Sequence, residues 1–151
     1  MRLFAALALL APVIERLALA VTQARAVDPT LRWVSPEQWH VTLAFFGEVP
    51  EPRVDDLSER LRRAGGRTSP IQLQLGAPAT FGSVRRARVL YAGLAEGTEE
   101  IARLAALCRA AGRRVGLARD DLAPQARFRP HVTLARAAPP RDVTDVLAAL
   151  T

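Results

Sequence analysis

The sequence predicts an α+β fold, and three observations support this. Strand-like runs of β-branched and aromatic residues alternate with longer segments whose apolar residues recur at helical spacing. Half of the 151 residues are hydrophobic, which suffices for the core of one compact domain over residues 1–151. A four-residue string, His-Val-Thr-Leu, begins at His40 and again at His131. The repeat predicts two related strands within that domain.

The first 21 residues predict a strand followed by a helix. Pro12 interrupts an apolar run at a position that suits the first turn of a helix, and Val13, Leu17 and Val21 follow at helical spacing. An early arginine and the Ala-Leu-Ala at 18–20 also match the layout of a secretory signal. We favour a strand followed by a helix over a secretory signal. No apolar stretch reaches the ~18 residues that span a bilayer, so we expect a cytoplasmic protein with no membrane partner.

The remaining elements follow from the same patterns. We expect strands over 31–34, 39–46, 71–75, 88–91 and 130–136, and helices over 51–63, 98–111 and 143–150. The pair Gly65-Gly66 predicts a break after the first of these helices, and Gly112 predicts the stop of the second. The charged side of the 51–63 helix, with Arg53, Arg60, Arg62 and Arg63, is typical of solvated surface.

The two repeated strings contain the only histidines of the chain. The second histidine would be followed by Val-Thr-Leu by coincidence on the order of once in a thousand. In a strand, residues i and i+2 share a face, so His40 and Thr42 project to one side while Val41 and Leu43 anchor the other. His131 and Thr133 repeat this arrangement. A lone histidine is more often a packed or surface residue, but two identical settings favour a functional pair.

Two histidines beside two threonines suit acid–base chemistry without a cofactor. A catalytic zinc needs three protein ligands, and no carboxylate lies three or four residues after either histidine, so we expect no metal. A neutral imidazole accepts a proton from water and a protonated one delivers a proton to a leaving oxygen. Threonine hydroxyls stabilise charge that grows on phosphate oxygens.

The charge of the chain favours an anionic partner. The formal net charge is +6, and every basic residue besides the histidines is arginine. The planar guanidinium suits phosphate oxygens, which makes RNA or a nucleotide the natural candidate. The alternative is that the absence of lysine reflects GC-rich coding. The single Cys108 excludes an intramolecular disulfide and predicts a packed thiol.

The paired His-x-Thr strings resemble those of the 2H phosphoesterase superfamily. The order Arg32-Trp33-Val34, Pro36-Glu37, His40 to Leu43, then Phe46 to Val49 resembles its RNA 2′,3′-cyclic phosphodiesterases, the family often called 2′-5′ RNA ligases, and residues 128–136 resemble its second motif. The resemblance implies two similar lobes related by a pseudo-twofold axis, with small antiparallel sheets lining a central cleft and helices outside. Members usually continue with further strands, so we expect the chain to lack the C-terminal ones.

The resemblance also implies a substrate and residue roles. The substrate is an RNA end carrying a 2′,3′-cyclic phosphate, opened to a 2′-phosphate, with reverse 2′-5′ joining of RNA ends. By analogy His40 is the general acid and His131 the general base. Thr42, Thr133, Arg136, Phe46 and Phe81 are the expected substrate contacts. Arg136 lies five residues past His131 and reaches phosphate only if its strand bends or ends.

Two other functions stay open at this point. One is a cyclic phosphodiesterase that acts on small nucleotides rather than RNA, and the other is a non-catalytic RNA-binding module that keeps the cleft. Retention of both histidines and both threonines argues against the module, because binding alone would tolerate their loss. We expect a monomer.

Overall fold

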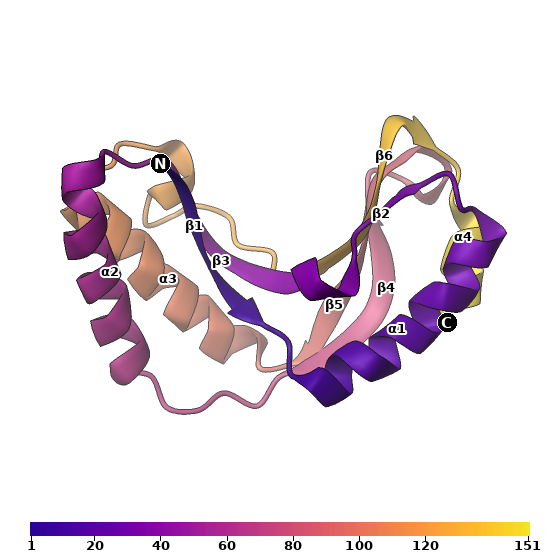
Figure 1. Ribbon diagram of the computed structural model, residues 1–151, viewed down its shortest axis with the longest axis horizontal. Coiled ribbons are helices and arrows are strands. Elements are labelled where there is room, and N and C mark those ends of the chain that lie inside the picture. The colour runs from indigo at the N-terminus through magenta and orange to yellow at the C-terminus, as the bar shows by residue number, and fades with distance from the viewer. The chain divides into compact units, whose positions relative to one another are not determined.

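The computed structural model describes residues 1–151 and confirms the α+β class (Figure 1). The four helices are α1 (Ala11–Val27), α2 (Glu51–Gly66), α3 (Thr98–Arg114) and α4 (Thr144–Leu150). The strands are β1 (Arg2–Ala8), β2 (Arg32–Trp33), β3 (His40–Glu48), β4 (Gln74–Phe81), β5 (Ala87–Glu96) and β6 (Val132–Arg141). None of the helices is long and apolar enough to cross a membrane.

The chain forms two compact units. Unit 1 comprises residues 1–7, 42–73 and 96–130, and unit 2 comprises residues 8–41, 74–95 and 131–151. Unit 1 therefore holds α2, α3, β1 and most of β3, whereas unit 2 holds α1, α4 and the remaining strands. The predicted N-terminal strand and helix are present as β1 and α1, with Pro12 in the first turn of α1.

Unit 2 is built on strand β6. Strands β2 and β5 pair antiparallel with β6, and the first residues of β3 join it through Val41 and Val132. Helices α1 and α4 lie against each other and against one face of these strands. Ala24 of α1, Val146 of α4, Leu90 of β5 and Ala135 of β6 meet in that core. The opposite face of these strands is not covered by α1 or α4, so its side chains are the candidates for a functional site.

Unit 1 packs α2 and α3 side by side over β3 (Figure 1). Phe46 of β3 and Leu122 are fully buried, and both lie against α3 at Gly112. A Cβ at Gly112 would lie 3.0 Å from a carbon of each of these side chains. The close approach of α3 to β3 therefore requires glycine at this position.

Some predicted boundaries were wrong. Gly112 lies inside α3, and the left-handed residue after this helix is Gly116, with φ of +87°. The Gly65-Gly66 pair likewise lies in the last turn of α2 rather than after it. Strand β4 begins at Gln74 and continues to Phe81, so the expected strand over 71–75 overlaps only its start.

Replacing Gly112 with alanine should destabilise the protein by about 1–2 kcal/mol. Overpacking costs about 1–3 kcal/mol, and the better helix propensity of alanine recovers up to about 1 kcal/mol. Urea unfolding followed by circular dichroism measures the change. Gly65→Ala is the matched control, because a Cβ there meets nothing within 4 Å. Equal midpoints for the two variants would contradict the packing described for Gly112.

Cys108 is buried in the core of unit 1, as the sequence predicted. Burial raises the pKa of its thiol to about 11, against a smaller opposite effect of Arg109. The thiol is therefore neutral at physiological pH and serves as a packed apolar group.

Candidate active site

Strand β3 presents His40 on one face and anchors itself by the other. Val41 and Leu43 are buried, whereas His40 and Thr42 are only partly buried, which is the predicted alternation. The Nδ1 atom of His40 lies 2.7 Å from the carbonyl oxygen of Gln38. A carbonyl oxygen can only accept, so Nδ1 donates this hydrogen bond. In the neutral imidazole the lone pair is then on Nε2, which is the atom positioned to exchange a proton.

The strand pairing in unit 2 brings the two repeated strings together. Val41 of β3 lies opposite Val132 of β6 in antiparallel register. Continuing this register by one residue places His40 across from Thr133. Since both valines are buried, His40 and Thr133 lie on the other face of the strands, and His131, two residues before Thr133, shares that face.

Thr42 is the first residue of unit 1 in this part of the chain. The alternation along β3 puts its hydroxyl on the same face of that strand as His40.

Two aromatic rings of unit 2 hold the ring of His131. The Phe81 ring lies 4.9 Å from it, centroid to centroid, and nearly perpendicular to it at 89°. The Tyr91 ring lies 5.3 Å from His131 and 4.4 Å from Phe81. Perpendicular contacts of this kind are favourable and directional, so the imidazole is oriented by packing. Phe81 thus has a structural contact with His131, and its predicted contact with substrate stays a prediction. Sequence reasoning did not identify Tyr91.

A β-bulge brings Arg136 onto the face of Thr133. On β5, Val89 and Tyr91 share a face, and their partners on β6 are Arg136 and Thr133. Three residue steps on β6 therefore match two on β5, because Leu134 is an extra residue. Arg136 consequently points to the side of Thr133, whereas a regular strand would have turned it away. Arg32 of β2 pairs directly with Arg136, which adds a second guanidinium on this face that the sequence analysis missed.

The internal repeat is longer in the structure than in the predicted four-residue string. In the six residues after His40 and after His131, buried positions occur in the same order, with both Leu-Ala pairs buried. Phe45 of β3 therefore occupies the position of Arg136 of β6, five residues past its histidine, and is partly exposed. Counting from the two histidines would have identified Phe45.

Phe46, the expected substrate contact, is in the core of unit 1 and only 1% exposed. It packs at Gly112 and Leu122, so it cannot touch a ligand without repacking of that core. The neighbouring Phe45 is the accessible ring. The guanidinium carbons of Arg2 and Arg119 lie 5.4 and 5.1 Å from its centroid, which makes it an aromatic surface surrounded by cations.

The structure contains no group of three or more His, Cys, Asp or Glu side chains placed to hold a metal ion. The polar groups gathered on the face of His40 and His131 in unit 2 are imidazoles, a hydroxyl and guanidinium groups. This set suits binding of an anion and transfer of protons at it.

Comparison with known proteins identifies relatives of this chain. The pattern of the 2′-5′ RNA ligase superfamily matches residues 11–151. A relative named RNA 2′,3′-cyclic phosphodiesterase, from Aquifex aeolicus, is 28% identical over 105 residues, which are 70% of this chain and 54% of the relative. The chain spans about half the length of the curated relatives it matches.

Solved structures give the same result. A protein of Thermus thermophilus superposes with a TM-score of 0.73 at 32% identity, covering 90% of this chain and 74% of that protein. LigT of E. coli complexed with 3′-AMP superposes with a TM-score of 0.66 at 28% identity, covering 93% and 77%. The repeated His-Val-Thr-Leu strands, the α+β fold and the match over residues 11–151 together show that the chain belongs to the 2′-5′ RNA ligase superfamily.

Proposed function

We propose that the protein is an RNA 2′,3′-cyclic phosphodiesterase that opens a terminal 2′,3′-cyclic phosphate to a 2′-phosphate by metal-independent acid–base catalysis. The observation that carries this proposal is the placement of His40, His131 and Thr133 on one face of paired strands, with their valine neighbours buried beneath. The name of the Aquifex aeolicus relative supports the substrate.

The reaction needs two proton transfers. His131 takes a proton from water as the water oxygen attacks phosphorus, and His40 gives a proton to the 3′ oxygen as the bond from that oxygen to phosphorus breaks. The products are a 2′-phosphate and a 3′-hydroxyl. The hydroxyls of Thr42 and Thr133 donate to the non-bridging phosphate oxygens, whose charge grows in the transition state. With the 5′-hydroxyl of a second RNA in place of water, the same transfers join the two through a 2′-5′ bond.

Arg136 in unit 2 and Phe45 in unit 1 are each proposed to contact the RNA substrate. The bulge in β6 puts Arg136 on the Thr133 face, where its guanidinium can bind a phosphate oxygen or stack on a base. Phe45 offers a partly exposed ring on the Thr42 side of β3, and bases stack on such rings without regard to sequence.

A second candidate function is hydrolysis of small cyclic nucleotides. The solved complex of E. coli LigT with 3′-AMP favours it, because that ligand is a single nucleotide. A single nucleotide would contact the histidines and threonines through its phosphate and would stack its base on one side chain only. The two candidates therefore differ in the length of the substrate and share the chemistry.

The test is hydrolysis of two substrates in EDTA, an oligoribonucleotide and a mononucleoside, each ending in a 2′,3′-cyclic phosphate. We expect both to be opened, the oligoribonucleotide with the higher kcat/KM. Activity on the mononucleoside alone would favour the second candidate. RNA binding with no turnover of either substrate would show that the protein is a non-catalytic RNA-binding module. Activity that EDTA abolishes and zinc restores would contradict the metal-free mechanism.

The packing of Phe81 on His131 gives a testable expectation. Phe81→Leu keeps an apolar side chain but removes the ring, and the contact is worth about 0.5–1.5 kcal/mol, so kcat should fall by roughly 2- to 12-fold with little change in KM. Steady-state kinetics measures this. Tyr91→Phe is the control, because it keeps its ring. A Phe81→Leu enzyme with the kcat of the wild type would show that the ring does not position His131.

A further inference from the structure

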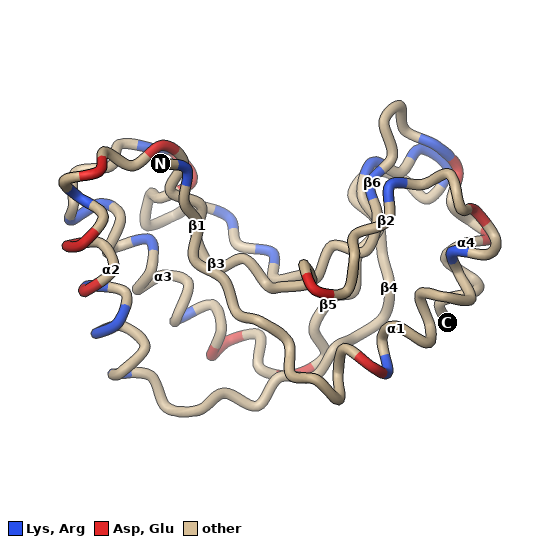
Figure 2. Tube along the Cα trace, in the orientation of Figure 1, with Lys and Arg blue, Asp and Glu red and all other residues tan.

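A cationic groove lies between α2 and α3 of unit 1, on elements that the proposed chemistry does not use. It has a volume of about 430 Å³. Its floor is made by small or apolar side chains and its rim by four arginines, and no carboxylate lines it: Ala64, Leu107, Ala110 and Ala111, then Arg60, Arg63, Arg67 and Arg114. We call this hollow the arginine groove. Figure 2 shows basic residues along both helices.

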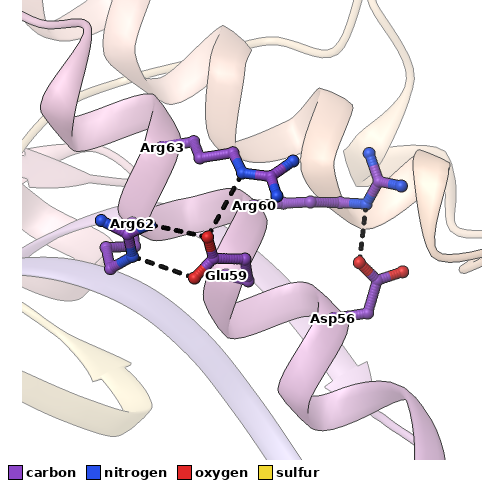
Figure 3. Close-up of polar contacts among 5 residues, drawn as sticks. All are labelled: Asp56, Glu59, Arg60, Arg62 and Arg63. Atoms are coloured by element: carbon purple, nitrogen blue, oxygen red, sulfur yellow. Dashed lines mark hydrogen bonds and ion pairs between the residues drawn. The ribbon is translucent and has the colours of Figure 1, made fainter.

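The carboxylates of α2 neutralise only part of this charge (Figure 3). Asp56 pairs with Arg60 at 3.1 Å, and Glu59 pairs with Arg62 at 2.6 Å and with Arg63 at 3.3 Å. The hydrogen bond from Arg62, which lies outside the groove, lowers the pKa of Glu59 to about 2 and is the largest of the causes. Arg67 and Arg114 form no ion pair. The groove therefore keeps two unneutralised cations in addition to the spare donors of Arg60 and Arg63.

The groove continues along the helices instead of ending in a single pocket. A second hollow, of about 280 Å³, shares Arg67 and Leu107 with it and is lined in addition by Arg103 and Glu100 of α3. Arg60, Arg63 and Arg67 follow one another at helical spacing, which spreads them over about 10 Å. A line of cations of this length fits the successive phosphates of an extended chain better than one isolated anion. The groove contains no aromatic side chain on which bases could stack, so the contacts that it offers are chiefly those of its arginines with a phosphate backbone.

Within unit 1 the groove is on the side of the helices, away from the Thr42 face of β3. Helix α3 covers β3 through Phe46, which lies against Gly112, and Thr42 points to the opposite side of that strand. A terminal nucleotide on the Thr42 face therefore does not occupy the groove.

We propose that the arginine groove binds the phosphate backbone of the RNA strand that precedes the reacting end. This inference rests on the proposed function, because it takes RNA as the substrate. The groove contributes affinity for long RNA without sequence preference and takes no part in the chemical step. Arg60 and Arg63 are on the charged side of α2, which is typical of solvated surface, and the groove gives them, with Arg67 and Arg114, a common ligand.

The test compares two variants of equal charge. Arg67→Gln with Arg114→Gln removes the two unpaired cations of the groove, and Arg16→Gln with Arg25→Gln removes two exposed arginines of α1 in unit 2. Fluorescence anisotropy reports binding of a labelled single-stranded RNA of about 16 nucleotides with a 3′-hydroxyl end, over a salt series. Each lost phosphate contact reduces the steepness of the plot of log K against log salt by about 0.7. If the contact contributes nothing near 1 M salt, its loss lowers the affinity for RNA about 5-fold near 0.1 M salt.

We expect the groove variant to bind RNA about 25-fold more weakly than the wild type near 0.1 M salt, with the slope reduced by about 1.4, and the α1 variant to lose much less. Equal losses in the two variants, or no RNA binding by the wild type, would overturn the inference.

Hydrolysis of a mononucleoside 2′,3′-cyclic phosphate by the wild type tests the proposed function separately. If this substrate is opened while both variants bind RNA equally, the function stands and the groove inference fails. If it is not opened while the groove variant alone loses RNA binding, the groove binds RNA and the proposed function fails. Circular dichroism of each variant confirms that the helices are intact.

Discussion

Alanine at His40 or at His131 should lower kcat for opening an RNA 2′,3′-cyclic phosphate by about 10²–10⁴-fold each. Each imidazole moves one proton in the proposed reaction, and the chain has no third histidine that could substitute. The double variant should be little worse than the worse single variant, since residues that act as a unit are not additive. Single-turnover kinetics with saturating enzyme measures the chemical step directly.

The pH dependence of the residual activity separates the two roles. A general base must be deprotonated, so it sets the acidic limb of the bell-shaped profile, and a general acid must be protonated, so it sets the alkaline limb. His131→Ala should therefore lose the acidic limb and keep the alkaline one, and His40→Ala should do the reverse. If His131→Ala instead lost the alkaline limb and His40→Ala the acidic limb, the two histidines would have exchanged roles. A bell-shaped profile that stays unchanged in either variant would show that the substituted histidine takes no part in the proton transfers.

Thr133→Val should lower kcat by about 10²–10³-fold, which is the usual loss when one donor to a developing oxyanion is removed. Valine has nearly the shape of threonine and suits a strand, so the change removes the hydroxyl with little effect on packing. Thr133 lies across from Tyr91 and, in the extended register, from His40, so its loss should affect the transition state more than substrate binding. Steady-state kinetics should show a large fall in kcat and a small change in KM.

Thr22→Val is the control for this substitution. Its hydroxyl donates to the carbonyl oxygen of Ala18 within α1, so its loss should leave kcat unchanged. A Thr133→Val enzyme that differs from the wild type only in KM would show that the hydroxyl binds the ground state as strongly as the transition state.

The central part of the site could be predicted from the sequence because it rests on short-range rules. Alternation along a strand determines which residues share a face. Because His40 and His131 have identical neighbours, the same rule predicts the same arrangement at both histidines. The buried Val41 and Val132 in the structure agree with this. The pairing of the two strands needed the structure, because antiparallel register is set by contacts between residues far apart in the chain.

The errors arose where tertiary packing overrode a local rule. Strict alternation from His40 puts Phe46 on the face of His40 and Thr42, but Leu43 and Ala44 are both buried, so Phe45 is the partly exposed ring and Phe46 is buried. Arg136 faces Thr133 only because Leu134 is an extra residue in β6, and no pattern in the chain announces that bulge. Gly112 resembled a helix stop, yet it is a packing glycine, and the left-handed position belongs to Gly116.

The measurement that tests the central claim most directly is the identity of the product formed from a short RNA with a 2′,3′-cyclic phosphate end, in EDTA, by the wild type and by His40→Ala and His131→Ala. The account predicts a 2′-phosphate from the wild type, because the 3′ oxygen is the one that departs, and almost none from either variant. A 3′-phosphate product, or equal conversion by either variant, would contradict it.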